Sequence, residues 1–160
     1  MAYTVDVQGT QRYPADFIRA VAAAANEAMT HQRVSEGAAL TILLTDDDYI
    51  QELNRQFRGE DRPTDVLSFP AGEPMPGNES LLEYLGDIAI AVLVAERQAT
   101  EKGHPLVAEL QLLAVHGVLH LVGYDHLESD EKEKMWGVQR TILMHLGLDN
   151  IQPTEDDHDD

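Results

Sequence analysis

An eleven-residue segment with the sequence HGVLHLVGYDH, which runs from His116 to His126, is the most informative part of this chain. His116 and His120 are four positions apart, so on a helix their imidazoles lie one turn apart on the same face. Gly123 predicts the end of that helix, because glycine adopts a left-handed conformation without a steric penalty. The turn can bring His126 back toward the other two histidines. Three neutral imidazoles with no fourth protein ligand nearby are typical of a zinc-type site that keeps one position open for water.

The residues around the first two histidines predict a helix that is buried on all sides. From Pro105 to Val122 the sequence is apolar nearly throughout, and a helix without a polar face belongs in a protein interior. A buried polar group without a partner costs about 1–3 kcal/mol. A lone histidine on a helix is more often a packing residue with a hydrogen-bond partner. Here one bound cation would satisfy both His116 and His120, so the burial and the spacing favour a metal site.

Length and composition restrict the class of protein. The chain has 160 residues, of which 43% are hydrophobic, and this is enough for one ordinary domain with a core. We expect that domain at 1–150, followed by an acidic, disordered tail at 151–160. Because the sequence has no cysteine, disulfides and thiolate metal sites are excluded. No secretory signal and no apolar run of about 20 residues is visible, so we expect a cytoplasmic protein without a membrane partner.

The charge of the chain is strongly negative. Its 29 acidic residues against 11 lysines and arginines give a formal net charge of −18. Nucleic acids favour basic surfaces, so the overall charge is a poor match for RNA or DNA. Any polyanionic substrate would therefore have to meet a local cluster of basic side chains.

Hydrophobic periodicity and helix-end signals predict the remaining elements. Strands are expected at Tyr3–Val7, Ala39–Leu44, Asp65–Phe69 and Leu85–Val92, and helices at Pro14–Met29, Thr45–Phe57, Leu93–Lys102, Pro105–Val122 and Ser129–Leu146. Thr45 with Asp48 resembles a capping box, and Ser129 is the expected N-cap of the last helix. The predicted fold class is α/β or α+β, a small mixed sheet packed with helices around a central histidine-bearing helix.

The histidine spacing also matches a protease pattern, but one important residue differs. Metzincin proteases have the pattern HExxHxxGxxH, in which the glutamate is the general base. Gly117 stands in place of that glutamate, so peptide hydrolysis becomes the second candidate. A three-histidine metal site without this base can still lower the pKa of bound water toward about 7 and polarise an oxyanion. Such chemistry suits a phosphodiester substrate.

A phosphodiester also needs a cation that neutralises the negative charge developing during cleavage, and this is normally an arginine. Three arginines lie between residues 55 and 62 of this otherwise acidic chain. If Phe57 faces the core with Leu53, its neighbour Arg58 can emerge at the end of the helix. The alternative is a solvated basic patch that pairs with the carboxylates at 46–48 and 60.

These motifs together resemble those of the YbeY family of metal-dependent endoribonucleases, which act in ribosomal RNA maturation. The resemblance rests on the segment 116–126, on LNRQFR at 53–58 with PTDVLSF at 63–69, and on LGDI at 85–88. It implies a zincin-like metal-hydrolase fold, a zinc ion held by His116, His120 and His126, and Arg58 as the catalytic arginine.

The same resemblance implies a substrate and partners. It implies single-strand-specific cleavage of an rRNA precursor, maturation of the 16S rRNA 3′ end, and a part in ribosome quality control. The small ribosomal subunit or its assembly factors are the implied partners, and DNA is not expected. One zinc ion per chain is expected, although three imidazoles also suit Ni²⁺ or another divalent ion. Two alternatives stay open, a zinc metallopeptidase-like hydrolase and a non-catalytic ribosome-assembly factor with a structural metal. Tyr124 and Asp125 are candidates for supporting the metal ligands only because they are adjacent in sequence.

Overall fold

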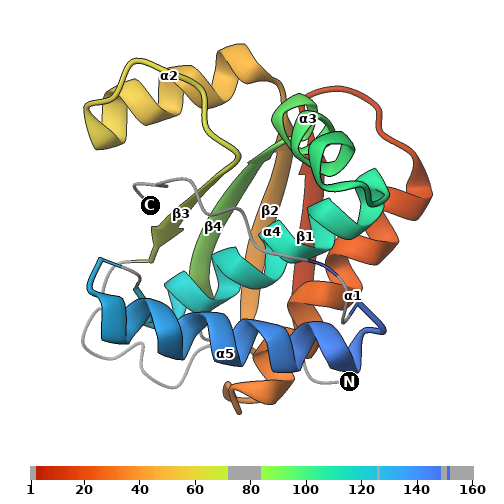
Figure 1. Ribbon diagram of the computed structural model, residues 1–160, viewed down its shortest axis with the longest axis vertical. Coiled ribbons are helices and arrows are strands. Elements are labelled where there is room, and N and C mark those ends of the chain that lie inside the picture. Colours follow the sequence, from red (N-terminus) through yellow and green to blue (C-terminus); the bar gives the residue numbers. More distant parts are fainter. Residues whose placement is uncertain (1–2, 72–83, 126, 149–150, 152–160) are drawn as a thin grey trace.

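The computed structural model describes residues 3–71, 84–125, 127–148 and 151. Its elements in chain order are β1 (Thr4–Gly9), α1 (Ala15–His31), β2 (Ala39–Thr45), α2 (Asp47–Arg58), β3 (Val66–Pro70), β4 (Tyr84–Ala91), α3 (Val92–Lys102), α4 (Leu106–Leu121) and α5 (Ser129–His145). They form a four-stranded sheet packed with helices (Figure 1). This confirms the predicted mixed α/β class.

The sheet has the strand order β1-β2-β4-β3. The pairs β1–β2 and β2–β4 are parallel, whereas β3 runs antiparallel to β4 at the edge of the sheet. The two inner strands β2 and β4 are rich in buried aliphatic residues, as expected for strands that helices cover. β1 alternates between exposed and half-buried residues, which fits its position at the other edge.

The helices form two groups. α1 and α4 contact each other and the sheet, and α5 contacts both of these helices, so α4 lies between the sheet and α5 (Figure 1). α2 packs on the sheet through a second, smaller cluster formed by Ile50, Leu67, Ala89 and Ala91. The larger core therefore surrounds α4.

The central position of α4 confirms the predicted buried helix. Eleven of its sixteen residues are buried, including residues on every side of the helix. The backbone leaves the helix at Gly123, which has a φ of 111°, as the glycine in this position predicts. The sequence therefore places the histidine-bearing segment correctly in the interior and at a helix end.

Two of the predicted helix caps are wrong by one residue. Thr45 is the last residue of β2, and Asp46 is the N-cap of α2, with its carboxylate accepting from the Tyr49 N–H at 2.8 Å. Glu128, and not Ser129, is the N-cap of α5. In each case the acidic residue immediately before the first helical position fills the role, which also suits the positive end of the helix dipole.

The N-terminal part of α4 contains a buried cluster of charged side chains. Glu109 is fully buried, and its carboxylate lies 3.1 Å from Lys102 Nζ and 2.6 Å from His104 Nε2. Gln98, with its amide nitrogen facing the carboxylates, donates to Glu109 at 2.9 Å and to the buried Asp65 at 3.2 Å. A buried carboxylate needs such partners because desolvation otherwise disfavours it strongly. The cluster ties α4 to α3 and to the start of β3.

Two sequence-based expectations concern membrane-spanning helices and the acidic tail. Within the described residues, no helix combines the length and the apolar character that crossing a lipid bilayer requires. The acidic tail predicted for 151–160 lies outside the described residues, apart from residue 151.

Candidate metal centre

The two histidines of α4 converge as their spacing predicts. His116 is buried and His120 is half-buried. Their Nε2 atoms lie 3.2 Å apart, and their ring planes are inclined by 74°. Two nitrogen ligands of a tetrahedral zinc ion, each about 2.0–2.1 Å from the metal, would lie about 3.3 Å apart. The observed separation therefore fits two ligands of one shared ion.

The third predicted ligand, His126, lies outside the described residues. Among the residues that the structure does describe, no group of three histidine or carboxylate side chains is arranged to hold a metal. The ligand set of three therefore stays a prediction, of which the structure places two members together.

A glutamine from a different helix supports the first histidine. Gln139 of α5 is buried, and its Oε1 atom lies 3.1 Å from His116 Nδ1. Because an amide oxygen can only accept, the Nδ1 atom carries the proton and the lone pair of the neutral ring is on Nε2. Histidines that bind metals characteristically donate their other N–H to such an acceptor. The bond thus directs a ligand-competent nitrogen toward His120.

The sequence contained a weak signal for this residue. Gln139 lies four positions after Met135 and three before Ile142, within the buried stripe of α5. A polar residue in an apolar stripe requires a buried partner. That partner cannot be identified from sequence, because His116 is 23 positions away. Tyr124 and Asp125, the candidates from sequence adjacency, are half-buried and line a neighbouring hollow, and their support of the metal ligands stays a prediction.

Trp136 contacts the same imidazole from another side. Its ring lies 5.6 Å from the His116 ring in an edge-to-face arrangement, which aromatic pairs prefer. Lys132 Nζ lies 5.7 Å from the centre of the Trp136 ring, within the range of a cation–π contact. Part of the packing of Trp136 is therefore against a candidate metal ligand.

Gly117 lies where α4 packs closely against the sheet. A Cβ atom added there would lie 2.8 Å from Ile88 Cγ2 and 2.9 Å from Ile88 Cδ1. These distances are shorter than van der Waals contact, so β4 occupies the space that a side chain would need. The metzincin glutamate is absent from the sequence, and any side chain at this position would require Ile88 to move, which weakens the peptidase alternative.

Arg58 is linked to the histidine helix through one residue of the edge strand. Its Nη2 atom donates to the Ser68 carbonyl at 2.6 Å, and the buried Ser68 hydroxyl donates to the Gly117 carbonyl at 3.4 Å. Its Nη1 atom also donates to the Phe57 carbonyl at 3.1 Å. Ser68 thus contacts both the candidate catalytic arginine and the turn of α4 that begins at His116. Nothing in the sequence identifies this bridge, because Ser68 and Gly117 are 49 positions apart.

The other two arginines of this region behave differently. Arg55 pairs with Glu52, and Arg62 Nε lies 2.7 Å from Glu60 Oε1. The pKa of Arg55 is raised above its usual value, mainly by the hydrogen bond to Glu52. Arg62 thus pairs with Glu60 as the alternative interpretation expects, whereas the partner of Arg55 is Glu52, which that interpretation does not name. Within the described residues, Arg58 makes no ion pair and is held by backbone carbonyls.

Phe57 does not face the core, so this expectation is wrong. Its side chain is 57% exposed. Leu53, one turn earlier, packs on the small cluster against the sheet. The last turn of α2 lies over the edge strand β3, where Phe69 packs edge-to-face against Phe57 and leaves more than half of Phe57 exposed. Arg58 nevertheless emerges at the end of the helix as predicted.

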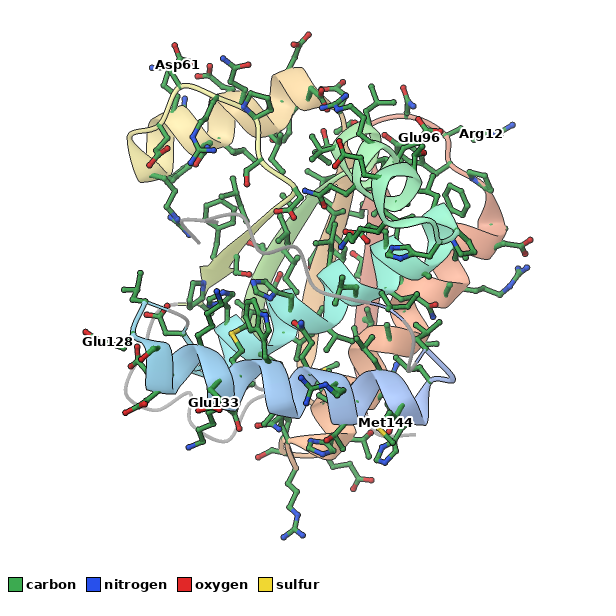
Figure 2. All side chains as sticks on the ribbon, in the orientation of Figure 1. Arg12, Asp61, Glu96, Glu128, Glu133 and Met144 are labelled. Carbon is green, nitrogen blue, oxygen red and sulfur yellow. The ribbon has the colours of Figure 1, made fainter. Side chains whose placement is uncertain are left out.

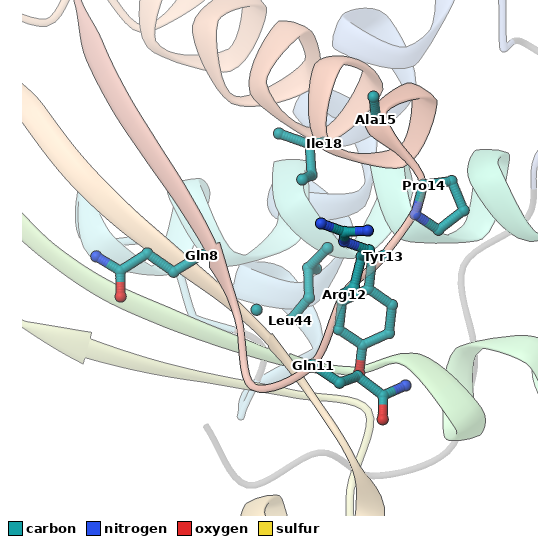
Figure 3. A pocket seen from close by; sticks show the side chains of 9 residues that line it. Gln8, Gln11, Arg12, Tyr13, Pro14, Ala15, Ile18 and Leu44 are labelled. Carbon is teal, nitrogen blue, oxygen red and sulfur yellow. The ribbon is translucent and has the colours of Figure 1, made fainter.

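The surface has two hollows, of which one adjoins the C-terminal end of α4. One of about 380 Å³ is lined by residues that directly follow His120, including Gly123 and Tyr124, together with Lys134 of α5. A second, of about 650 Å³, lies where β1 leads into α1 and includes Arg12 and Tyr13 (Figure 3). None of the residues that line the second hollow is a predicted site residue. Figure 2 shows Arg12 and Glu128, at the start of α5, on opposite sides of the molecule.

The fold and the site together define a class of protein: an α/β domain built around a buried helix with two convergent imidazoles. The sequence matches the family described as Endoribonuclease YbeY over residues 5–147. The chain belongs to the Endoribonuclease YbeY family. This confirms the resemblance that the motifs indicate.

Relatives and a solved structure agree with this assignment. An Endoribonuclease YbeY from Rhodopseudomonas palustris is 51% identical over 112 residues, which cover 70% of this chain and 59% of that relative. One from Pelotomaculum thermopropionicum is 48% identical over 78% of this chain and 83% of its own length. One from Bacillus licheniformis is 38% identical over 87% and 91%, respectively. The solution structure of TM1509 from Thermotoga maritima is similar with a TM-score of 0.57 and 26% identity, covering 96% of this chain and 100% of that chain.

Proposed function

We propose that this protein is a single-strand-specific metallo-endoribonuclease of the cytoplasm. Its proposed substrate is an rRNA precursor, and its proposed roles are maturation of the 16S rRNA 3′ end and ribosome quality control. Membership of the Endoribonuclease YbeY family supports an endoribonuclease activity. The observation that carries the chemistry is the 3.2 Å approach of the two Nε2 atoms of His116 and His120.

We further propose that His116, His120 and His126 hold one divalent ion, Zn²⁺ or alternatively Ni²⁺. The separation of the first two nitrogens fits a shared ion, and Gln139 fixes the ring of His116 in the tautomer that a ligand needs. A divalent ion in this position would supply Lewis-acid activation of water and of a phosphate oxygen. His116 and His120 would hold that ion near the end of the buried helix α4.

The proposed role of Arg58 is to contact the scissile phosphate and to stabilise the negative charge that develops on it. A guanidinium has five N–H donors, and its bonds to the Ser68 and Phe57 carbonyls hold its position and leave further donors for a phosphate. Guanidinium groups match phosphate oxygens in a bidentate geometry. The link through Ser68 to Gly117 keeps this cation close to the α4 turn that carries the histidines.

The charge of the chain bears on how RNA reaches the site. With a formal net charge of −18, the protein as a whole repels polyanions, and only local cations such as Arg58 oppose this. We therefore propose that the small ribosomal subunit or an assembly factor presents the RNA. Delivery by a partner replaces the electrostatic steering that basic nucleases use.

The decisive experiment compares Arg58→Ala with the wild type in cleavage of a single-stranded RNA. Loss of one charge-stabilising donor lowers kcat by roughly 10²–10³-fold in well-studied enzymes, and a loss of this size is expected here. Metal content per chain, measured by elemental analysis, should stay near that of the wild type. Arg55→Ala is the matched control, because Arg55 lies on the same helix and pairs with Glu52 in solvent. Cleavage that survives Arg58→Ala unchanged would refute the assigned role.

The same preparation tests the two alternatives. A metal-loaded protein that degrades casein but leaves RNA intact would be a peptidase, which the contact of Gly117 with Ile88 disfavours. A protein that cleaves neither substrate after rigorous removal of contaminating nucleases, but unfolds when the metal is withdrawn, would be an assembly factor with a structural metal.

A further inference from the structure

The last turn of α2 presents an aromatic side chain to solvent directly beside Arg58. Phe57 is 57% exposed, although burial of a phenylalanine side chain would contribute roughly 1.5–3 kcal/mol. The exposed ring immediately precedes Arg58, the residue proposed to contact the scissile phosphate. An exposed aromatic residue in this position suggests a binding role.

The ring is held in place from one side. Phe69 of β3 packs edge-to-face against Phe57, with ring centres 5.4 Å apart and an interplanar angle of 73°. The Arg58 guanidinium carbon lies 5.1 Å from the centre of the Phe69 ring, in the geometry of a cation–π contact. Phe57, Phe69 and Arg58 thus form one aromatic–cation cluster. Arg58 is itself anchored on the Ser68 carbonyl, so the cluster is positioned relative to the edge strand.

We propose that Phe57 is a stacking platform for one unpaired nucleobase of the RNA substrate, close in sequence to the phosphate that Arg58 contacts. This inference rests on the proposed endoribonuclease function. Proteins that bind single strands combine cations along the backbone with aromatic rings on which splayed bases stack. A base inside a duplex is already stacked and paired, so such a platform selects single-stranded RNA.

The pairing of an exposed aromatic ring with a guanidinium favours RNA over a protein partner at this surface. An aromatic ring beside a guanidinium offers a base and a phosphate their two usual contacts in one place. In a chain with a formal net charge of −18, long-range attraction cannot supply the affinity for RNA. Short-range stacking therefore carries a larger share of binding here than in a basic nuclease.

The first experiment separates binding from chemistry by measuring kcat and KM on a short single-stranded RNA. Stacking is worth about 1–3 kcal/mol per base, so Phe57→Ala should raise KM roughly 5- to 150-fold while kcat changes little. Phe57→Tyr should retain the wild-type KM. Phe57→Leu keeps apolar bulk without an aromatic face, so its KM should resemble that of Phe57→Ala. Tyr49→Ala is the control, because Tyr49 is 45% exposed on the same helix but about 12 Å away along its axis.

The second experiment identifies the stacked base. Substrates carrying an abasic ribose at successive positions near the cleaved bond are compared in the wild type and in Phe57→Ala. At one position, removal of the base should raise the KM of the wild type by the same factor as the substitution Phe57→Ala does on the intact substrate. For the Phe57→Ala variant, removal of that base should not raise the KM any further. This coincidence is the expected signature of a base resting on the ring.

Specific outcomes would overturn the inference. A wild-type KM for Phe57→Leu would mean that apolar packing and not stacking is required. An effect of Phe57→Ala that persists on every abasic substrate would indicate a role in local structure, and an unchanged KM would leave a protein partner as the ligand of this surface. The proposed function fails separately, if the metal-loaded wild type cleaves no RNA.

Discussion

The close packing of Gly117 against Ile88 gives a stability prediction whose sign is set by the structure. Glycine inside a helix is normally unfavourable, and replacement by alanine stabilises by about 0.8–1.0 kcal/mol. At position 117 the new methyl group would meet three side-chain atoms of Ile88 at 2.8, 2.9 and 3.1 Å. Overpacking of this kind typically costs about 1–3 kcal/mol. We therefore expect Gly117→Ala to destabilise the protein by about 1 kcal/mol.

The chain offers a matched control for this substitution. Gly137 lies within α5, and a Cβ added there would meet nothing within 4 Å. Gly137→Ala should therefore stabilise the protein by the full helix-propensity gain of about 0.8–1.0 kcal/mol. A third variant, Ile88→Ala, removes all three of the atoms that oppose a Cβ at position 117. In that background Gly117→Ala should become stabilising, because the added methyl partly fills the new cavity.

Urea unfolding followed by far-ultraviolet circular dichroism measures these differences. All variants should be compared after treatment with a chelator, because a bound ion would add its own stabilisation. In thermal unfolding, a change of about 1 kcal/mol corresponds to roughly 2–4 °C for a domain of this size. If Gly117→Ala stabilises the protein as much as Gly137→Ala does, α4 does not approach β4 as closely as described, and the steric argument against a glutamate at this position fails.

Three further predictions follow from the site and its surroundings. Gln139→Met removes the acceptor for His116 and should weaken metal binding roughly 10- to 100-fold in a chelator competition. Gln139→Glu keeps an acceptor at this position and should bind metal with wild-type affinity. Equal affinity in all three proteins would contradict the inferred support of His116 by Gln139. Glu109→Gln breaks the buried contacts with Lys102 and His104 and should cost about 3 kcal/mol in urea unfolding, so a loss below about 0.5 kcal/mol would mean that solvent already screens them. Burial, reinforced by the hydrogen bond to Asp87, raises the pKa of Tyr84 above 10.0. The folded state therefore holds this proton more tightly than the unfolded state, so the wild type should lose stability more steeply than Tyr84→Phe as the pH rises above about 10. Parallel curves of unfolding free energy against pH for the two proteins would disprove this.

The parts of the site that come from one stretch of chain could be predicted from the sequence. The spacing of His116 and His120 predicts their convergence, the apolar surroundings predict the burial of α4, and Gly123 predicts where the helix ends. All three depend on local geometry, which the order of residues determines directly. The predicted caps of α2 and α5 fail by one residue, because several neighbouring side chains can cap a helix and the sheet register decides which residue is outside it.

The parts that depend on contacts between distant segments could not be predicted. Gln139 and Ser68 acquire their roles only when α5 and β3 pack against α4, and neither position has a distinctive local pattern. Phe57 shows the opposite failure, since its spacing from Leu53 predicts burial. The prediction assumes that the sheet covers the whole apolar face of the helix, whereas the last turn of α2 lies over the edge strand β3, which contacts Phe57 through Phe69 and leaves more than half of it exposed. Hydrophobic periodicity indicates which face of a helix is apolar, but not how much of that face the neighbouring strands cover.

The polar residues of α4 have a consequence for how the helix is oriented. A helix that is aliphatic on every side buries nearly the same area at any rotation about its own axis. Hydrophobic burial alone therefore does not determine which side of the helix faces the sheet. Glu109 and His116 are seven residues apart, which places them almost in line and about 10 Å from each other along the axis. Each is hydrogen-bonded to a separate neighbouring helix, Glu109 through Gln98 of α3 and His116 through Gln139 of α5. These two attachments hold α4 in one angular setting, and that setting decides which way the converging imidazoles of His116 and His120 face.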